Sequence, residues 1–177
     1  MLITKYIKMK TKRAISEDNQ EIIELLQNSQ LPSEDIDLKK QDFFILEKEG
    51  VPVALCAVEI YESDALLRSF AVVDKFRGKG LGFQIYIDVL DYLVKREVKS
   101  VFLLTTTAES WFERYGWMKI KREAVPSAIK ETSEFKSVCP GTAVCMQLNL
   151  NNLHIFHALK DFHSRFFYPL YSDKDKK

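Results

Sequence analysis

The spacing of apolar and polar residues predicts alternating helices and strands. Residues 17–29, EDNQEIIELLQNS, carry isoleucine and leucine at helical spacing, and Ser16 stands before them as an N-cap. The runs FFILEKEG and VPVALCAVEIY predict two strands that turn at Glu49 and Gly50. The next run, LLRSFAVV, is almost continuously apolar, as a central strand buried on both faces would be.

The second half of the chain continues this alternation. We expect a long helix over residues 80–96, a strand in SVFLLTTT, a short helix in AESWFERYG that Gly116 ends, and two final strands in WMKIKREAV and TAVCMQLNL. With a short strand over residues 12–14, the order is β-α-β-β-β-α-β-α-β-β. This order predicts an α/β fold of the mixed α+β kind, with a central mixed sheet of about six to seven strands and helices on both faces.

Composition and charge narrow the class of protein. The chain has 177 residues, 46% hydrophobic and 29% charged, which suits one core, and we assign residues 12–150 to a single domain. Residues 1–11 are then a flexible basic leader, and residues 151–177 a helical extension with a mobile tail.

The formal net charge of +1 gives no reason to expect a nucleic acid or a membrane as partner. Because Cys56, Cys139 and Cys145 show no CxxC spacing and follow no secretory signal, we expect a reducing, cytoplasmic compartment and no disulfide.

The C-terminal run combines histidines and aromatic residues. His154, His157 and His163 lie among aromatic side chains at helical spacing. Structural zinc needs four ligands and an open zinc site needs three plus water, so we expect no metal site. The aromatic stripe predicts packing against the domain or against a second subunit, which leaves a homodimer open.

Three of the six glycines, Gly78, Gly80 and Gly82, cluster between the apolar strand and the long helix. Backbone N–H groups in such a turn point outward with no side chain over them, and the helix dipole adds positive potential, which favours phosphate binding. Arg77 and Lys79 add full charges beside it. The dinucleotide pattern G-x-G-x-x-G does not fit, because an isoleucine occupies its third glycine position. The alternative is a turn that uses glycine only for its conformation.

Two motifs resemble those of the GNAT superfamily of acyl-CoA-dependent N-acetyltransferases. The pattern R-x-x-G-x-G after FAVVDKF is similar to the family's pyrophosphate loop, and AESWFERYGW is similar to its second signature, one helix and one strand later. The resemblance covers about residues 12–148 and implies acetyl-CoA as cosubstrate. It also implies that strand amides hold the pantetheine arm and the glycine turn holds the pyrophosphate. The cofactor-binding residues implied are Phe70, Ala71, Val72, Arg77, Gly78, Lys79, Gly80, Leu81, Gly82, Thr106 and Phe112.

A closer resemblance lies outside this shared core. The runs LLQNSQLPSEDI, VEIYESDALLRSFAV, LLTTTAESWF and REAVPSAIKETSEFKSVCPGTAVCM are similar to the arsenic-resistance branch of the family. The characterised activity of that branch is N-acetylation of arsinothricin, an arsenic-containing glutamate analogue related in shape to phosphinothricin. The resemblance therefore implies detoxification, with a small-molecule amine as the substrate.

Arg68 is a lone charge inside the apolar run LLRSFAVV, where burial is expensive unless a partner compensates it. If residues 62–65 form the hairpin turn, Tyr61 lies opposite Leu66 and Glu59 lies opposite Arg68. One interpretation is a cross-strand salt bridge. The other is a clamp in which Arg68 binds the substrate's carboxylate or arsinate, while Glu59 faces its ammonium group and acts as general base, directly or through water.

Acetyl transfer also needs donors for the thioester oxyanion and a proton for the leaving thiolate. We expect the donors to be the amides of Phe70 and Ala71, beside Ser69, whose side chain points to the opposite face while its backbone stays close to the substrate. Relatives with a tyrosine in the second signature use it as the acid, but Phe112 occupies that position here. Tyr115 lies nearly one helical turn further on, as a substitute acid or as a core aromatic residue.

Residues 126–140 form a longer connection than a plain hairpin requires, and loops beyond about 12 residues in compact domains are commonly functional. We expect this loop to fold over the amine pocket, with Ile129, Thr132 and Phe135 against the substrate. The alternative is a surface loop without a role in binding. Cys139 is not expected to be a nucleophile, because no histidine is recognisably placed to pair with it.

Two functions of different classes follow. The first is an N-acetyltransferase that moves acetyl directly from acetyl-CoA to the amine of a small anionic amino acid or analogue. The second is a GNAT-like module that binds acyl-CoA as a sensor or scaffold, which the phenylalanine at Phe112 would explain. Within the enzyme class, acetylation of peptide or protein amines would require an open groove, which the long loop disfavours.

Overall fold

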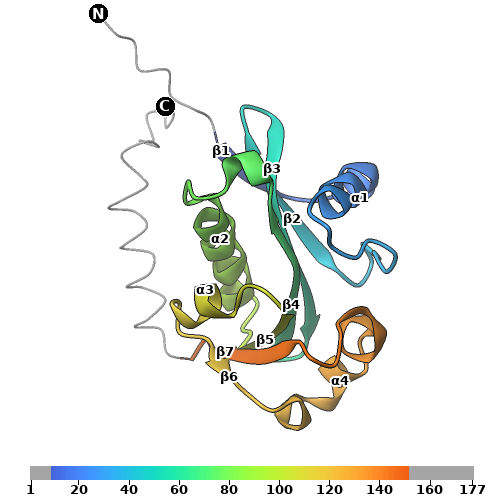
Figure 1. Ribbon diagram of the computed structural model, residues 1–177, viewed down its shortest axis with the longest axis vertical. Helices are drawn as coiled ribbons and strands as arrows, with labels where there is room; N and C mark the ends of the chain where they lie inside the picture. The colour runs from blue at the N-terminus through green and yellow to red at the C-terminus, as the bar shows by residue number, and fades with distance from the viewer. Residues whose placement is uncertain (1–8, 152–177) are drawn as a thin grey trace, which may run out of the picture.

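One mixed sheet of seven strands organises the fold, with the strand order β1-β2-β3-β4-β5-β7-β6 (Figure 1). The computed structural model describes residues 9–151. The strands are β1 Met9–Arg13, β2 Asp42–Lys48, β3 Val51–Tyr61, β4 Asp64–Val72, β5 Ser100–Thr105, β6 Met118–Lys119 and β7 Val144–Asn149. The α-helices are α1 Asn19–Asn28, α2 Leu81–Lys95, α3 Glu109–Glu113 and α4 Ser127–Lys130, with 3-10 or π turns at Ser16–Asp18, Asp74–Phe76, Arg122–Ala124 and Glu134–Val138. The predicted mixed sheet is confirmed.

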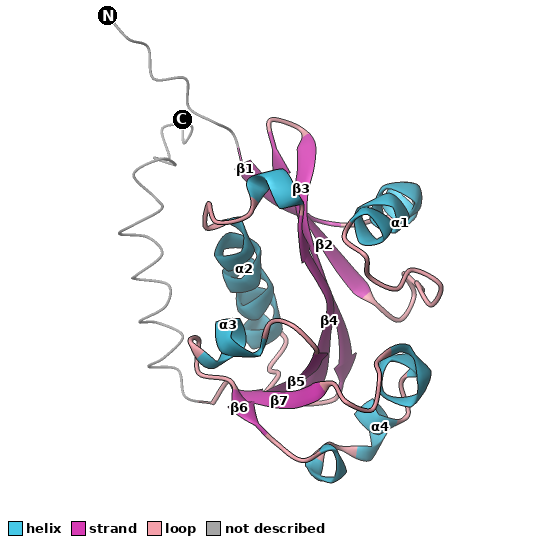
Figure 2. Cartoon of the chain, viewed as in Figure 1, coloured by secondary structure: helices cyan, strands magenta, loops and turns pink. Residues whose placement is uncertain are grey.

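Helices cover both faces of this sheet, as predicted (Figure 2). Side chains of β2 and β3 alternate between two hydrophobic clusters, because successive residues of a strand point to opposite faces. On one face α1 packs Ile22 and Leu26 against Phe43 and Leu55. On the other face α2 and α3 join the larger cluster, which holds Phe44, Leu46 and the buried side chains of α2. Each fully buried Leu, Ile or Phe side chain contributes about 1.5–3 kcal/mol.

Strands β4 and β5 pair over only part of their length. Their parallel ladder joins residues Asp64, Ala65 and Leu66 to Ser100, Val101 and Phe102. Beyond Leu66, β4 keeps its partner β3 on one side while β5 keeps β7 on its other side, and Figure 1 shows the two strands diverging. The divergence opens a gap in the middle of the sheet.

A β-bulge lies in β4 just beyond this point. Leu55 pairs with Ala71 and Ala57 pairs with Arg68, so β4 carries one more residue than β3 over this stretch. Ser69 takes up the irregularity with a φ of 52°, in the left-handed region. The bulge interrupts the alternation of side chains, and the prediction that Ser69 points away from the site rested on that alternation.

The predicted register of the β3–β4 hairpin is wrong. Tyr61 pairs with Asp64 across a two-residue turn, in which Glu62 has a φ of 54°, so Glu59 lies opposite Leu66. Arg68 lies opposite Ala57 instead. Glu59 and Arg68 still meet, because a residue two positions from the directly paired one shares its face of the sheet.

Two other predictions need correction. Ser16 does not cap the first helix: it begins a 3-10 turn, and the Asp18 carboxylate accepts a hydrogen bond from the Ile15 amide at 2.9 Å. Of the run WMKIKREAV, only Met118–Lys119 forms a strand. The chain then leaves the sheet through a 3-10 turn, which brings Val125 into a buried cluster with Phe102 and Cys145.

Some expectations fall wholly or partly outside the described residues. The C-terminal extension, with His154, His157 and His163, lies there from residue 152 onward. Strand β1 begins at Met9, so the sheet starts before residue 12, where the domain was expected to begin. Within residues 9–151, no helix is long and apolar enough to cross a bilayer, and no cluster of three or more His, Cys, Asp or Glu side chains is arranged to hold a metal ion.

Candidate active site

The glycine turn leads directly into the N-terminus of α2. Gly78 and Gly80 have φ values of 72° and 78°, a conformation that side chains with a Cβ rarely adopt, and Gly80 is the N-cap of the helix. The first-turn amides of an α-helix point out of its end without intrahelical partners. The turn therefore places backbone donors at the start of a helix, a geometry that favours anion binding.

Gly82 serves a different purpose from the other two glycines. A Cβ on this residue would lie 3.3 Å from Val72 Cγ2 and 3.7 Å from Phe70 Cζ. Its missing side chain therefore lets the first turn of α2 approach β4. Arg77 Nε donates to the carbonyl of Val72 at 3.0 Å, which holds its exposed guanidinium beside the turn, and Lys79 Nζ donates to the carbonyl of Lys75 at 2.9 Å.

Aromatic side chains from α3 close one side of the gap. Phe70 of β4 lies 5.3 Å from Trp111 and 5.8 Å from Phe112, measured between ring centroids. The ring of Tyr115 packs against Trp111 and Phe83 at 4.7 and 4.8 Å. Burial raises the pKa of Tyr115, which makes its phenol a weaker acid. This placement favours the core-aromatic interpretation of Tyr115.

A cavity of about 240 Å³ opens where β4 and β5 diverge. Four parts of the chain line it. They are residues 30–32 after α1, residues 67–70 of β4, residues 103–108 of β5 and the turn after it together with Phe112 of α3, and part of the loop over residues 126–140, called the late loop below. Thr106 is among these residues, and so are Arg68, Ser69 and Phe70, which the bulge brings to the same cavity. The Thr105 hydroxyl stabilises the turn after β5 by accepting a hydrogen bond from the Ala108 amide at 3.0 Å.

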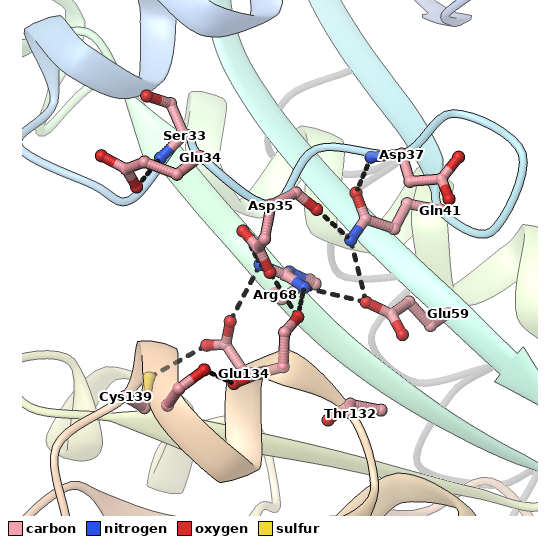
Figure 3. A network of polar contacts seen from close by, with 12 residues as sticks. Ser33, Glu34, Asp35, Asp37, Gln41, Glu59, Arg68, Thr132, Glu134 and Cys139 are labelled. Atoms are coloured by element: carbon pink, nitrogen blue, oxygen red, sulfur yellow. Dashed lines mark hydrogen bonds and ion pairs between the residues drawn. The ribbon is translucent and has the colours of Figure 1, made fainter.

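Three carboxylates converge on the guanidinium of Arg68 (Figure 3). Nη2 donates to both oxygens of Asp35 at 2.7 and 2.8 Å and lies 3.1 Å from Glu134 Oε2, while Nη1 donates to Glu59 Oε1 at 2.9 Å. The Arg68 side chain is only 2% exposed. Its Nε is buried and has no hydrogen-bond partner among the described residues. The salt bridge expected between Glu59 and Arg68 is present, and it belongs to a larger network.

Glu59 contacts Arg68, but it is not one of the residues that line the cavity. Its carboxylate accepts hydrogen bonds from Gln41 Nε2 at 3.1 Å and from the Tyr61 hydroxyl at 2.6 Å, besides that from Arg68. Burial and this carboxylate raise the pKa of Tyr61, so the phenol remains a donor. Glu59 therefore helps to hold the Arg68 guanidinium in place.

Sequence reasoning missed two members of the network. Asp35 lies in the loop after α1 and Glu134 in the loop before β7, far from Arg68 along the chain. Burial acts to raise the pKa of Asp35, but the Ser133 hydroxyl and the Arg68 guanidinium outweigh it and hold that pKa below its usual value. The only signal for Glu134 was the unusual length of its loop.

The late loop contributes to the wall of the cavity, but the residues that line it are not the ones expected. Ile129 is fully buried in a cluster with Leu66 and Phe102, and Phe135 packs against the same cluster. The Thr132 hydroxyl donates to the carbonyl of Ile129 at 2.7 Å. None of Ile129, Thr132 and Phe135 lines the cavity; the loop residues that do are Glu134, Val138, Cys139 and Pro140.

The chain belongs to the acetyltransferase (GNAT) family, which residues 12–117 match. This assignment agrees with the divergent strands and the glycine turn, and it makes the protein an acetyl-CoA-dependent N-acetyltransferase with acetyl-CoA as its cosubstrate. Over 110 residues the chain is 30% identical to an uncharacterized N-acetyltransferase of Chlorobaculum tepidum. The aligned region covers 61% of this chain and 68% of that protein.

Solved structures share the fold. N-acetylglutamate synthase from Neisseria gonorrhoeae, complexed with coenzyme A and N-acetyl-glutamate, superposes with a TM-score of 0.70 at 17% identity, covering 81% of this chain. The matched part is only 35% of that synthase. The ribosomal-protein-S18-alanine N-acetyltransferase from Escherichia coli superposes with a TM-score of 0.60 at 18% identity, covering 80% of this chain and 94% of that one.

Proposed function

We propose that this enzyme acetylates the amine of a small amino acid, or of an analogue of the arsinothricin or phosphinothricin type, that also carries an anionic group. The observation that carries the proposal is a buried guanidinium, Arg68, at the cavity wall among three carboxylates. Such a wall offers partners for an ammonium group and for an anion. The cavity of about 240 Å³ also favours a small acceptor, since sites for drug-sized ligands measure roughly 300–1,000 Å³.

The residues around the gap fit acetyl-CoA, which supplies an acetyl group activated as a thioester. Beyond Leu66 the backbone of β4 is no longer paired with β5, so the amides of Phe70, Ala71 and Val72 are proposed to hold the pantetheine arm. The turn over residues 77–82 is proposed to hold the pyrophosphate, because its glycine conformations expose backbone N–H groups at the start of α2. Thr106 and Phe112 would line the thioester end.

The chain's own contribution to transfer is then mainly positioning. The amides of Phe70 and Ala71 follow the bulge at Ser69, and we assign them to the developing oxyanion. Arg68 keeps Nε as a donor for the acceptor's anionic group, since its terminal nitrogens are already paired. Glu59 acts on the acceptor through Arg68, as a positioning residue.

Thiol release from acetyl-CoA tests this proposal. We expect selective turnover of amino acids with an anionic side group, arsinothricin or phosphinothricin over a lysine peptide. Arg68→Ala should raise KM for the amine while KM for acetyl-CoA stays within about twofold. Peptide turnover exceeding that of every amino acid would overturn the proposal in favour of protein acetylation. Detoxification in a reducing cytoplasm is the biological use we propose, supported by the free thiols of Cys56, Cys139 and Cys145.

A further inference from the structure

Glu134 differs from the other two carboxylates of the Arg68 network in its access to the cavity. It is one of the cavity-lining residues, whereas Asp35 and Glu59 are not. Its residue exposure is 8%, so it is buried in the protein but bordered by the space an acceptor would occupy. An acceptor that enters this cavity meets Glu134 first among the three.

Glu134 also has the most unused capacity for hydrogen bonds. A carboxylate offers about four acceptor sites on its two oxygens. Among the described residues, Glu59 accepts three hydrogen bonds from three donors, and Asp35 accepts three as well, two from Arg68 Nη2 and one from the Ser133 hydroxyl. Glu134 has two side-chain partners there, the Cys139 thiol at 3.0 Å and Arg68 Nη2 at 3.1 Å. Room remains for donors from an acceptor.

The charges of the network do not balance without a ligand. Three carboxylates surround one guanidinium, which leaves a formal excess of two negative charges beside the cavity. Buried charges without a counter-charge are costly, and an incoming cation relieves that cost. Within residues 9–151 the Nε of Arg68 has no hydrogen-bond partner, which is a second sign that the network is incomplete without a ligand.

We propose that Glu134 binds the ammonium group of the acceptor and that Cys139 positions the Glu134 carboxylate for this contact. This inference rests on the proposed function and assigns a specificity-determining residue within it. The thiol of Cys139 donates to Glu134 Oε1, and the Cys139 amide donates to the Glu134 carbonyl at 3.0 Å. These two bonds fix the side chain at the cavity wall, on a segment that contributes nothing to the sheet.

Kinetics of Glu134→Gln are the first test. Loss of one charge-assisted hydrogen bond should raise KM for the acceptor by on the order of ten- to a hundredfold while KM for acetyl-CoA changes less than about twofold. The matched control is Glu131→Gln, the same change at an exposed residue of the same loop, paired with Lys136, which should behave as wild type. An unchanged KM for the acceptor in Glu134→Gln would overturn the proposal.

Substitutions at Cys139 test the positioning role. Cys139→Ala removes the donor and should raise KM for the acceptor a few-fold at unchanged kcat, whereas Cys139→Ser keeps a donor and should restore it. A purely structural role would instead affect both variants alike, with equal effects on both substrates.

Alkylation of Cys139 measures ammonium binding without turnover. Cys139 lines the cavity while Cys56 and Cys145 are buried, so iodoacetamide labelling with mass spectrometry follows this thiol. Ethylammonium should slow labelling of Cys139 in wild type but not in Glu134→Gln. Acetate, which carries the opposite charge, is the control for effects that do not depend on a cation. Equal protection in both proteins would overturn the assignment of Glu134. If ethylammonium protects but no amino acid is acetylated, the proposed acceptor class fails while the Glu134 assignment stands.

Discussion

Replacing Arg68 with methionine should destabilise the fold severely, because it removes the one cation that three carboxylates share. The side chain is 2% exposed and makes contacts of 2.7–3.1 Å to Asp35, Glu59 and Glu134, so solvent screens these interactions little. Deleting one partner of a buried ion pair costs about 3–5 kcal/mol of unfolding free energy, because it leaves an uncompensated charge in the interior. For a domain of this size that corresponds to a fall in Tm of about 6–20 °C.

The pH dependence of this penalty separates electrostatics from packing. The pKa of Asp35 is lowered in the folded protein, so its pairing stabilises the fold above the unfolded pKa and is lost as pH falls through the folded pKa. Without Arg68 the pKa of Asp35 should rise, since burial then dominates. The difference in unfolding free energy between wild type and Arg68→Met should therefore shrink between about pH 5 and pH 3.

Urea unfolding followed by circular dichroism at several pH values measures this difference directly. Lys40→Met is the control, because Lys40 is an exposed cation whose pairing with Asp37 is solvent-screened. A penalty below about 1 kcal/mol at pH 7, or one that does not change with pH, would refute the reasoning.

Three further substitutions test the cosubstrate side of the site. Gly80→Val forces a β-branched residue into a φ of 78°, which costs about 1–3 kcal/mol, and should abolish acetyl-CoA binding in calorimetric titration; normal binding would remove the turn from the proposal. Gly82→Val places a Cβ 3.3 Å from Val72 Cγ2 and should lower stability by about 1–3 kcal/mol in thermal melts. Tyr115→Phe should keep kcat within about twofold, because the ring packs as a core aromatic; a hundredfold loss would make Tyr115 the thiolate acid.

Much of the fold could be predicted because its signals are local. The turn at Glu49 and Gly50 contains a glycine, which favours the positive φ observed there at 79°, and α2 carries a clear helical period. The β3–β4 register could not be predicted in the same way. Its turn holds Glu62 and Ser63, neither of them a glycine, so nothing local distinguishes a two-residue turn from a four-residue one.

The candidate site was predicted in its centre but not at its edges. Arg68 stands out as a charge in an apolar strand, and Glu59 lies close enough in the chain to be found by strand pairing. Asp35 and Glu134 lie in loops, where no periodicity relates a residue to its distant partner. The bulge at Ser69 was equally hidden, since a single extra residue leaves the apolar pattern of β4 intact.

The Arg68 network also bears on how the enzyme acquires its activity. Its members come from four separate segments, and the Asp35 carboxylate and the Ser133 hydroxyl that bonds to it are separated by 98 positions in the chain. Contacts of such sequence separation form slowly, because loop closure must precede any gain from them. During refolding the sheet should therefore form before acetyltransferase activity returns, because the acceptor pocket is the last part of the structure to form.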